Sequence, residues 1–190
     1  MAALFNVTLE GSGRHIHVTR ETLDTLFGRG FELEKNKPLS QPGQYASRQK
    51  VDVAGPKGKL TLTIVGPCRA ADQVEVSLTE ARTLGINAPI RLSGDLKGSG
   101  ACTVTGPNGS VDIPEGVIVA QRHLHVSAED GVKYGLKDGD AVQIKVGGER
   151  ALVFDALTAR VGPTHATFAH IDYDEVNAIA GVATGEVIKL

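Results

Sequence analysis

The stretches Arg14-His15-Ile16-His17-Val18 and Arg122-His123-Leu124-His125-Val126 are two copies of one phrase, and they hold four of the six histidines in this chain of 190 residues. Residues i and i+2 of a β-strand project from the same face, so each His-x-His pair presents two imidazoles side by side. Imidazole is the commonest metal-binding side chain near neutral pH, and catalytic zinc takes three protein ligands and leaves a fourth position open. The sequence therefore predicts two half-built metal sites.

A longer pattern surrounds these copies and occurs four times. Each occurrence is a strand that ends in a potential ligand, followed by an apolar residue and a helix N-cap with acidic residues in the first helical turn. The four occurrences are His17-Val18-Thr19, Glu75-Val76-Ser77, His125-Val126-Ser127 and His170-Ile171-Asp172. We expect the four short helices to end at Gly28, Gly85, Gly135 and Gly181. An ancestral duplication explains the pattern most simply and predicts that the four ligand positions are spatially related.

The rest of the chain is typical of a β-rich protein with an aliphatic core. It has 23 Gly and 8 Pro, no Trp, and 41% hydrophobic residues. Alternation of apolar and polar residues predicts strands at Phe5–Leu9, Lys50–Val53, Lys59–Val65, Ala101–Thr105, Gly116–Ala120, Ala141–Val146 and Ala151–Phe154. The turns Gly55-Pro56-Lys57-Gly58 and Gly106-Pro107-Asn108-Gly109 indicate hairpins. Short strands with frequent glycine turns indicate a barrel or a sandwich.

Charge and composition narrow the class of partner. The net charge is −2 and no Lys/Arg cluster occurs, which argues against a nucleic acid or an anionic membrane as the main partner. Two widely spaced cysteines form no disulfide framework, and no signal peptide or membrane-spanning apolar run is visible. The length suits one domain or two small ones. We expect a cytoplasmic protein that acts on a small molecule.

Single residues near the predicted sites allow more than one interpretation. Imidazoles with one carboxylate suit zinc, cobalt, iron or manganese better than calcium or magnesium, and zinc is the default. Arg69 could hold a phosphate or carboxylate in its planar fork, or form a surface salt bridge. Cys68 is interpreted as a small buried apolar residue rather than a reactive thiol. His165 is placed at the surface or beside the metal ligands.

Several motifs, in a fixed order, resemble the PduL-type phosphate propanoyltransferases, which are the phosphotransacylases of bacterial microcompartments and of some acetate pathways. The resemblance covers residues 4–190. The motifs are Arg14-His15-Ile16-His17, Lys37-Pro38-Leu39-Ser40-Gln41-Pro42-Gly43-Gln44, Gly66-Pro67-Cys68-Arg69, Gln73-Val74-Glu75-Val76-Ser77, Arg91-Leu92-Ser93-Gly94-Asp95-Leu96, Arg122-His123-Leu124-His125, Gly147-Gly148-Glu149-Arg150 and His170-Ile171-Asp172.

The resemblance implies a mainly β fold of two tandem, similar β-barrels capped by short α-helices. The first barrel would comprise residues 1–13 with 117–190 and the second 14–116, with the active site between them. It also implies two zinc ions, with one ligand set of His15, His17 and Glu75 and a second of His123, His125 and His170. Arg69 matches the arginine that holds phosphate in that family. Ser12, Lys37 and Asn177 match residues that contact coenzyme A.

The implied activity is the reversible conversion of an acyl-CoA and phosphate into an acyl phosphate and CoA. The acyl chain would be short, propanoyl or acetyl, and transfer would be direct, since no protein nucleophile is obvious. Many microcompartment members carry an amino-terminal extension that directs encapsulation, which is not evident here, so we expect a cytoplasmic location, with a microcompartment lumen as a second one. For a compact enzyme of this size we expect a homodimer. Two alternatives stay open: a dinuclear metal hydrolase, and a non-catalytic binding module that zinc only stabilises.

Overall fold

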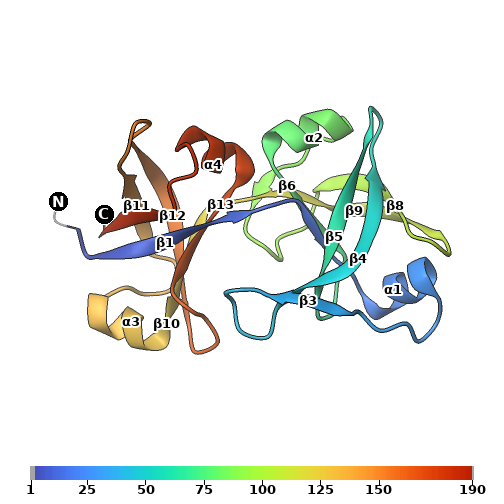
Figure 1. Cartoon of the computed structure of the whole chain (residues 1–190), viewed down its shortest axis with the longest axis horizontal. Coiled ribbons are helices and arrows are strands. Elements are labelled where there is room, and N and C mark those ends of the chain that lie inside the picture. Colours follow the sequence, from blue (N-terminus) through green and yellow to red (C-terminus); the bar gives the residue numbers. More distant parts are fainter. Residues whose placement is uncertain (1–2, 190) are drawn as a thin grey trace. The chain divides into compact units, whose positions relative to one another are not determined.

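The computed structural model describes residues 3–189, which fall into two compact units, each built around a closed barrel of six strands. Within the described residues, unit 1 comprises 3–12, 40–42 and 121–189, and unit 2 comprises 13–39 and 43–120. The prediction of a mainly β fold with two β-barrels and short helices is confirmed. Figure 1 shows both units and labels many of their elements. None of the helices among residues 3–189 is long and apolar enough to cross a membrane.

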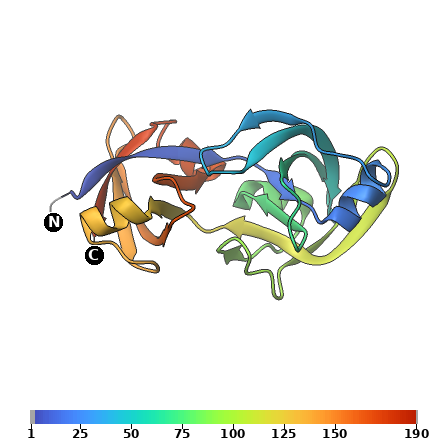
Figure 2. The same ribbon diagram turned by 90° about the horizontal axis from the view of Figure 1, so that it is seen from below.

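The barrel of unit 1 closes in the order β1-β13-β10-β12-β11-β14, with β14 pairing back to β1. Its strands are β1 (Phe5–Ser12), β10 (His123–Ser127), β11 (Ala141–Val146), β12 (Leu152–Gly162), β13 (Phe168–Asp172) and β14 (Thr184–Lys189). The first strand of the chain thus completes a barrel whose other five strands come from the carboxyl-terminal third. Figure 2 shows β1, in blue, beside the orange and red strands of this unit.

The barrel of unit 2 closes in the order β4-β5-β2-β6-β9-β8, with β8 pairing back to β4. Its strands are β2 (His15–His17), β4 (Tyr45–Ala54), β5 (Lys59–Gly66), β6 (Gln73–Val76), β8 (Gly100–Thr105) and β9 (Ser110–Ala120). Two further short strands lie outside the ring: β3 (Lys35–Pro38) pairs with β4, and β7 (Ile90–Arg91) pairs with β9.

The two barrels have the same strand topology. In both, the His-x-His strand pairs parallel with one neighbour and antiparallel with the other: β2 with β5 and β6, and β10 with β12 and β13. The remaining pairings make β1 equivalent to β9, since each is parallel to the strand that carries the third ligand. Each repeat of the chain therefore places its first strand in one barrel and its next five barrel strands in the other.

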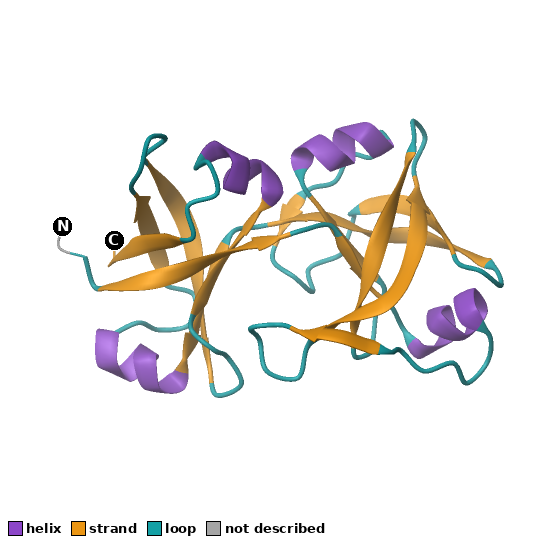
Figure 3. Ribbon diagram, in the orientation of Figure 1, coloured by secondary structure: helices purple, strands orange, loops and turns teal. Residues whose placement is uncertain are grey.

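Four short helices follow the His-x-His strands and the third-ligand strands (Figure 3). Their N-caps are the four predicted residues, Thr19, Ser77, Ser127 and Asp172. Each cap side chain accepts a hydrogen bond from the backbone N–H three residues further along the chain. The helices are α1 (Arg20–Phe27), α2 (Leu78–Leu84), α3 (Ala128–Tyr134) and α4 (Tyr173–Ala178).

The predicted helix ends are confirmed at Gly28, Gly85 and Gly135, whereas Gly181 is wrong as an end. Helix α4 stops at Ala178 with Ile179 as its C-cap. Ala180 and Gly181 both have positive φ, of 53° and 74°, and together they reverse the chain, so that the N–H of Gly181 returns to the carbonyl of Val176. The glycine closes the turn after the helix and does not end the helix.

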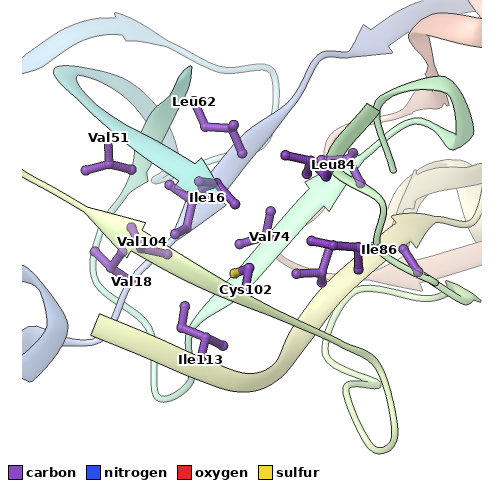
Figure 4. Packing of buried hydrophobic residues seen from close by; sticks show 14 of the residues in the cluster. Ile16, Val18, Val51, Leu62, Val74, Leu84, Ile86, Cys102, Val104 and Ile113 are labelled. Carbon is purple, nitrogen blue, oxygen red and sulfur yellow. The ribbon is translucent and has the colours of Figure 1, made fainter. Parts of the chain in front are cut away.

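Alternation along the strands divides the side chains into a core set and an outer set. In unit 2 the core is aliphatic and gathers residues such as Ile16, Val74 and Val104 from three strands (Figure 4). Unit 1 has its own core with Leu124, Val126 and Ile171 among its members. The seven predicted strands are present, and both Gly-Pro-x-Gly turns join hairpins. Each barrel therefore has a separate hydrophobic core, and the histidine-bearing strands contribute to it.

Candidate metal centres

The strands β2 and β10, which carry the His-x-His pairs, turn apolar side chains toward the core on one face and the histidines toward the other. Ile16 and Val18 are fully buried in the core of unit 2, and Leu124 and Val126 hold the same positions in unit 1. Because neighbouring side chains alternate, the histidines between them project away from the barrel core. The apolar residues thus fix the strand, and the strand fixes the direction of the imidazoles.

In unit 2 the antiparallel pairing of β2 with β6 places His15 directly opposite Glu75. Glu75 Oε2 lies 3.6 Å from His15 Nε2, and His15 Nε2 lies 3.2 Å from His17 Nε2. One ligand atom from each of the three residues falls within 4.8 Å of the other two. The structure thus brings together the three residues of the first expected ligand set.

In unit 1 the same register places His123 directly opposite His170. The Nε2 atoms of His123 and His125 are 3.0 Å apart, and the ring of His170 lies 5.2 Å and 5.0 Å from the other two ring centres. The ligand atoms of these three residues also lie within 4.8 Å of one another. The second expected ligand set is therefore assembled as well, with a third imidazole where unit 2 has a carboxylate.

Hydrogen bonds at the far side of the rings leave the facing nitrogens available to a metal. Nδ1 of His15, His17 and His123 lies 2.8, 3.1 and 2.8 Å from the backbone carbonyls of Gly13, Val65 and Gln121, so each Nδ1–H can donate and leave a lone pair on Nε2. Zinc–nitrogen bonds of about 2.0–2.1 Å in a tetrahedral site separate two ligand nitrogens by about 3.3 Å. The observed separations between Nε2 atoms, 3.0 Å in unit 1 and 3.2 Å in unit 2, are close to this spacing and therefore suit zinc.

Burial keeps the imidazoles of His17 and His125 in the neutral form that binds metals. Burial, with His15 and Arg69 nearby, lowers the pKa of His17 from 6.5 to about 3. Burial, with His123 and His170 nearby, lowers the pKa of His125 to about 2. Nδ1 of His125 is buried and has no hydrogen-bond partner among the described residues, so packing against neighbouring rings positions this imidazole in place of a backbone carbonyl. Neutral, desolvated imidazoles in such groups are suited to a divalent cation such as zinc.

Arg69 is connected to the cluster of unit 2 through a chain of side chains. Its Nη1 donates to Ser93 Oγ at 3.2 Å, and Gln73 Nε2 donates to the same oxygen at 2.8 Å and to Glu75 Oε1. The contribution of Arg69 to the lowered pKa of His17 places the guanidinium within electrostatic reach of that ring. A cation with a planar fork thus lies beside a possible metal centre, which suits a phosphate or carboxylate ligand.

The three expected coenzyme A residues are divided between the units. Ser12 is half-buried at the end of β1, and its backbone pairs with Asp172. Asn177 is exposed in α4, where its carbonyl accepts a hydrogen bond from Arg150. Lys37 is exposed in β3 of unit 2. Their contact with coenzyme A stays a prediction.

Two further sequence interpretations can be compared with the structure. His165 lies beside the expected metal ligand His125, with a ring-centre distance of 4.6 Å, and its Nδ1 is hydrogen-bonded to the carbonyl of Arg160. Cys68 is half-buried and packs against the core of unit 2, and burial raises the pKa of its thiol. The interpretation of Cys68 as a small apolar residue therefore agrees with its surroundings.

Several residues at the two clusters were given no role from the sequence. Gln73 and Ser93 connect Arg69 to Glu75, while Glu10 and Ser40 lie beside His170. Gln73 had a signal, because it stands two residues before Glu75 on one strand and shares its face. Glu10 had none, and Ser40 stood in a quoted motif without a role, since both lie more than 100 residues from His170 along the chain.

Comparison with known proteins gives a consistent result over nearly the whole chain. The phosphate propanoyltransferase family matches residues 8–182. The phosphate propanoyltransferase of Clostridioides difficile is 45% identical over 185 residues, which is 97% of this chain and 88% of that protein. That of Enterococcus faecalis is 46% identical, covering 95% and 87%, and that of Thermotoga maritima is 45% identical, covering 94% and 86%.

The chain is an acyltransferase, because the proteins that it resembles over nearly its whole length are phosphate propanoyltransferases. The chain belongs to the phosphate propanoyltransferase family.

Proposed function

We propose that the protein is a phosphotransacylase that interconverts a short acyl-CoA plus phosphate with the acyl phosphate plus CoA, in both directions. Propanoyl is the first candidate acyl group, because the relatives are named for it, and acetyl is the second. The observation that carries the proposal is the connection of Arg69 to Glu75 through Ser93 and Gln73, which joins a cationic fork to a possible metal centre.

The two clusters would hold two zinc ions that serve one reaction. His15, His17 and Glu75 would hold one ion, and His123, His125 and His170 the other. Bound zinc would supply a Lewis acid and lower the pKa of a coordinated thiol such as that of CoA. Three protein ligands at each cluster leave a position for a substrate atom, which distinguishes this proposal from a module that zinc only stabilises.

Arg69 would bind the phosphoryl oxygens and balance their charge during transfer. Its guanidinium makes charge-assisted hydrogen bonds in a fork that matches phosphate geometry. Ser93 accepts from Arg69 and so orients the fork, while Gln73 holds both Ser93 and Glu75. Positioning of the acyl donor and the acceptor in one site then supplies much of the rate enhancement. Ser12, Lys37 and Asn177 would contact coenzyme A.

Transfer would be direct, without an acyl-enzyme on cysteine. Burial raises the pKa of Cys68, and it raises the pKa of Cys102 to about 12. The thiolate is the nucleophilic form, so neither thiol is activated at neutral pH.

The experiment is an assay of thioester formation from CoA with acetyl, propanoyl and butanoyl phosphate, and of the reverse reaction from acyl-CoA and phosphate. Native, chelator-treated and zinc-restored protein would be compared, with Glu75→Gln as the site variant and Glu34→Gln, an exposed carboxylate of the same unit, as its control. We expect activity that needs CoA, falls on chelation, returns with zinc and is lost only in Glu75→Gln. Phosphate release without CoA would instead establish the hydrolase.

We further propose that the protein works as a homodimer in the cytoplasm, or in a microcompartment lumen. Light scattering of the purified protein across a range of concentrations tests the first statement, and a fluorescent fusion in a cell that forms microcompartments tests the second. A mass of one chain at all concentrations would contradict the homodimer.

A further inference from the structure

Glu10 lies beside His170 without being a member of the predicted ligand sets. Parallel pairing of β1 with β13 aligns the two residues, and Glu10 Oε2 is 3.2 Å from His170 Nε2. The same carboxylate oxygen accepts a 2.5 Å hydrogen bond from the hydroxyl of Ser40. All three residues belong to unit 1. The carboxylate is therefore held in place by one hydroxyl and directed at one ring nitrogen.

The equivalent position in unit 2 carries no carboxylate. There the third ligand, Glu75, pairs with Ile118 of β9, the strand equivalent to β1. Ile118 is fully buried and cannot hydrogen-bond through its side chain. The two third ligands therefore have different partners. The second nitrogen of His170 faces Glu10 across the strand pair, whereas the second oxygen of Glu75 accepts a hydrogen bond from Gln73 of its own strand.

The position of Glu10 makes it a partner of His170 rather than a fourth ligand. At this cluster, the group of described residues whose ligand atoms all lie within 4.8 Å of one another consists of His123, His125 and His170, without Glu10. Ligands of one tetrahedral zinc would be about 3.3 Å apart. Glu10 falls outside that group, so its oxygens lie too far from at least one of the other ligand atoms to share a tetrahedral zinc with all three.

We propose that Glu10 is a positioning residue that fixes the tautomer of His170. Its carboxylate accepts a hydrogen bond from Nε2–H and leaves the lone pair of Nδ1 for the metal. The roles of the two nitrogens are thus reversed relative to His15, His17 and His123, whose Nδ1 atoms face backbone carbonyls. The inference deepens the proposed function and rests on the metal at this cluster.

Zinc affinity and the tautomer of His170 test the inference without an activity assay. The variants are Glu10→Ala, which removes the acceptor, and Glu10→Gln, whose amide oxygen can still accept. Glu186→Gln, on the neighbouring strand β14, is the matched control. Competition with a chromophoric chelator gives the zinc dissociation constant of each cluster. Long-range ¹H–¹⁵N spectra of the metal-free protein show which nitrogen of His170 carries the proton, and His170→Gln identifies the signals of that residue.

We expect Glu10→Ala to raise the zinc dissociation constant of one cluster about 10- to 100-fold and to leave that of the other cluster unchanged, because loss of a partner of a ligating histidine has that effect. Glu10→Gln should restore most of the loss, and Glu186→Gln should behave as wild type. His170 should carry its proton on Nε2 in the wild type and lose that preference in Glu10→Ala. The melting temperature of the metal-free protein should change little, which separates positioning from a structural role.

Two results would overturn the inference alone. One is a Glu10→Ala variant with two unchanged zinc constants, and the other is a wild-type His170 protonated on Nδ1. A wild-type protein that binds no zinc would contradict the metal-dependent part of the proposed function, and this inference with it. The wild-type titration therefore distinguishes the two failures.

Discussion

The side-chain amide of Gln73 donates a 2.5 Å hydrogen bond to Oε1 of Glu75, its neighbour on the same face of β6. The amide orientation is fixed, because its oxygen accepts from the backbone N–H of Gly94 at 2.8 Å. Oε1 of Glu75 is therefore occupied, and Oε2 faces His15. The relationship assigns the two oxygens of Glu75 different roles before any metal binds.

Gln73→Ala should weaken zinc binding at the cluster of unit 2. Loss of the amide frees the carboxylate of Glu75 to rotate, and partners of ligating residues are worth about 10- to 100-fold in metal affinity. Chelator competition measures the change, with Gln143→Ala on β11 as a control in the other barrel. Equal loss in both variants would show a general effect on folding and contradict the assigned role.

Arg69→Lys should lower kcat/KM for acyl phosphate while leaving zinc content unchanged. A lysine keeps the charge but loses the fork, and a hydrogen bond to a charged group is worth about 1.5–3 kcal/mol, or roughly 10- to 100-fold. Steady-state kinetics with varied acyl phosphate measure it. Arg82→Lys, an exposed arginine in α2, is the control. A kcat/KM equal to wild type in Arg69→Lys would argue against phosphate binding by this residue.

Metal-free protein should lose stability as the pH falls below 6.5. The folded-state pKa values of His17 and His125, about 3 and about 2, lie below the unfolded value of 6.5. The unfolded chain therefore takes up protons first, and stability that is complete above pH 6.5 declines as the pH falls. Urea unfolding of chelator-treated protein between about pH 7.5 and 5 measures the decline.

The variant His17→Gln with His125→Gln serves as the comparison for that decline. It removes both depressed groups, so its stability should change less over the same range. A decline as steep as that of the wild type would attribute the pH dependence to other residues.

Ser77→Ala should reduce the free energy of unfolding by about 1 kcal/mol. Ser77 and Glu80 form a reciprocal capping box at the start of α2, and alanine leaves the N–H of Glu80 without its partner. Ser77→Gly should cost only a few tenths of that amount, because glycine leaves the helix end open to water. Chemical denaturation of the zinc-free forms compares them. A larger loss in the glycine variant would place the role of Ser77 in packing.

Cys68→Ala should retain acyl transfer at close to the wild-type rate. The raised pKa of its thiol leaves it protonated, and it packs against the core of unit 2. Mass spectrometry of the wild type during turnover should detect no acyl group on the cysteine. An acylated Cys68 together with an inactive alanine variant would establish an acyl-enzyme and overturn direct transfer.

The parts of the fold that sequence patterns predicted are those that short-range chemistry determines. The four N-caps were predictable because a cap residue and the N–H it binds are three residues apart. Strand β3 was not predicted, since all four of its residues, Lys35–Pro38, are exposed and no apolar alternation marks them. Strand β14 was missed because one of its two buried positions is Gly185, which has no apolar side chain.

The candidate site also has residues that sequence patterns predicted and residues that only the three-dimensional pairing of strands brings together. The His-x-His pairs and their repeat positions led to the six clustered residues, because alternation and repetition are visible in one dimension. Glu10 is separated from His170 by 160 residues, and the register that joins them depends on β1 completing a distant barrel. A carboxylate in such a strand has the appearance of any solvent-facing residue until the pairing is known.

The exchange of first strands between barrels has a consequence for the origin of the chain. If the chain were cut between β8 and β9, neither fragment would contain the six strands of one barrel, since each would hold five and one strand of the other. Two separate copies of a single repeat that kept this strand order would close by swapping those strands, as a domain-swapped dimer does. Fusion of two such genes turns a bimolecular assembly step, which depends on protein concentration, into an intramolecular one that does not.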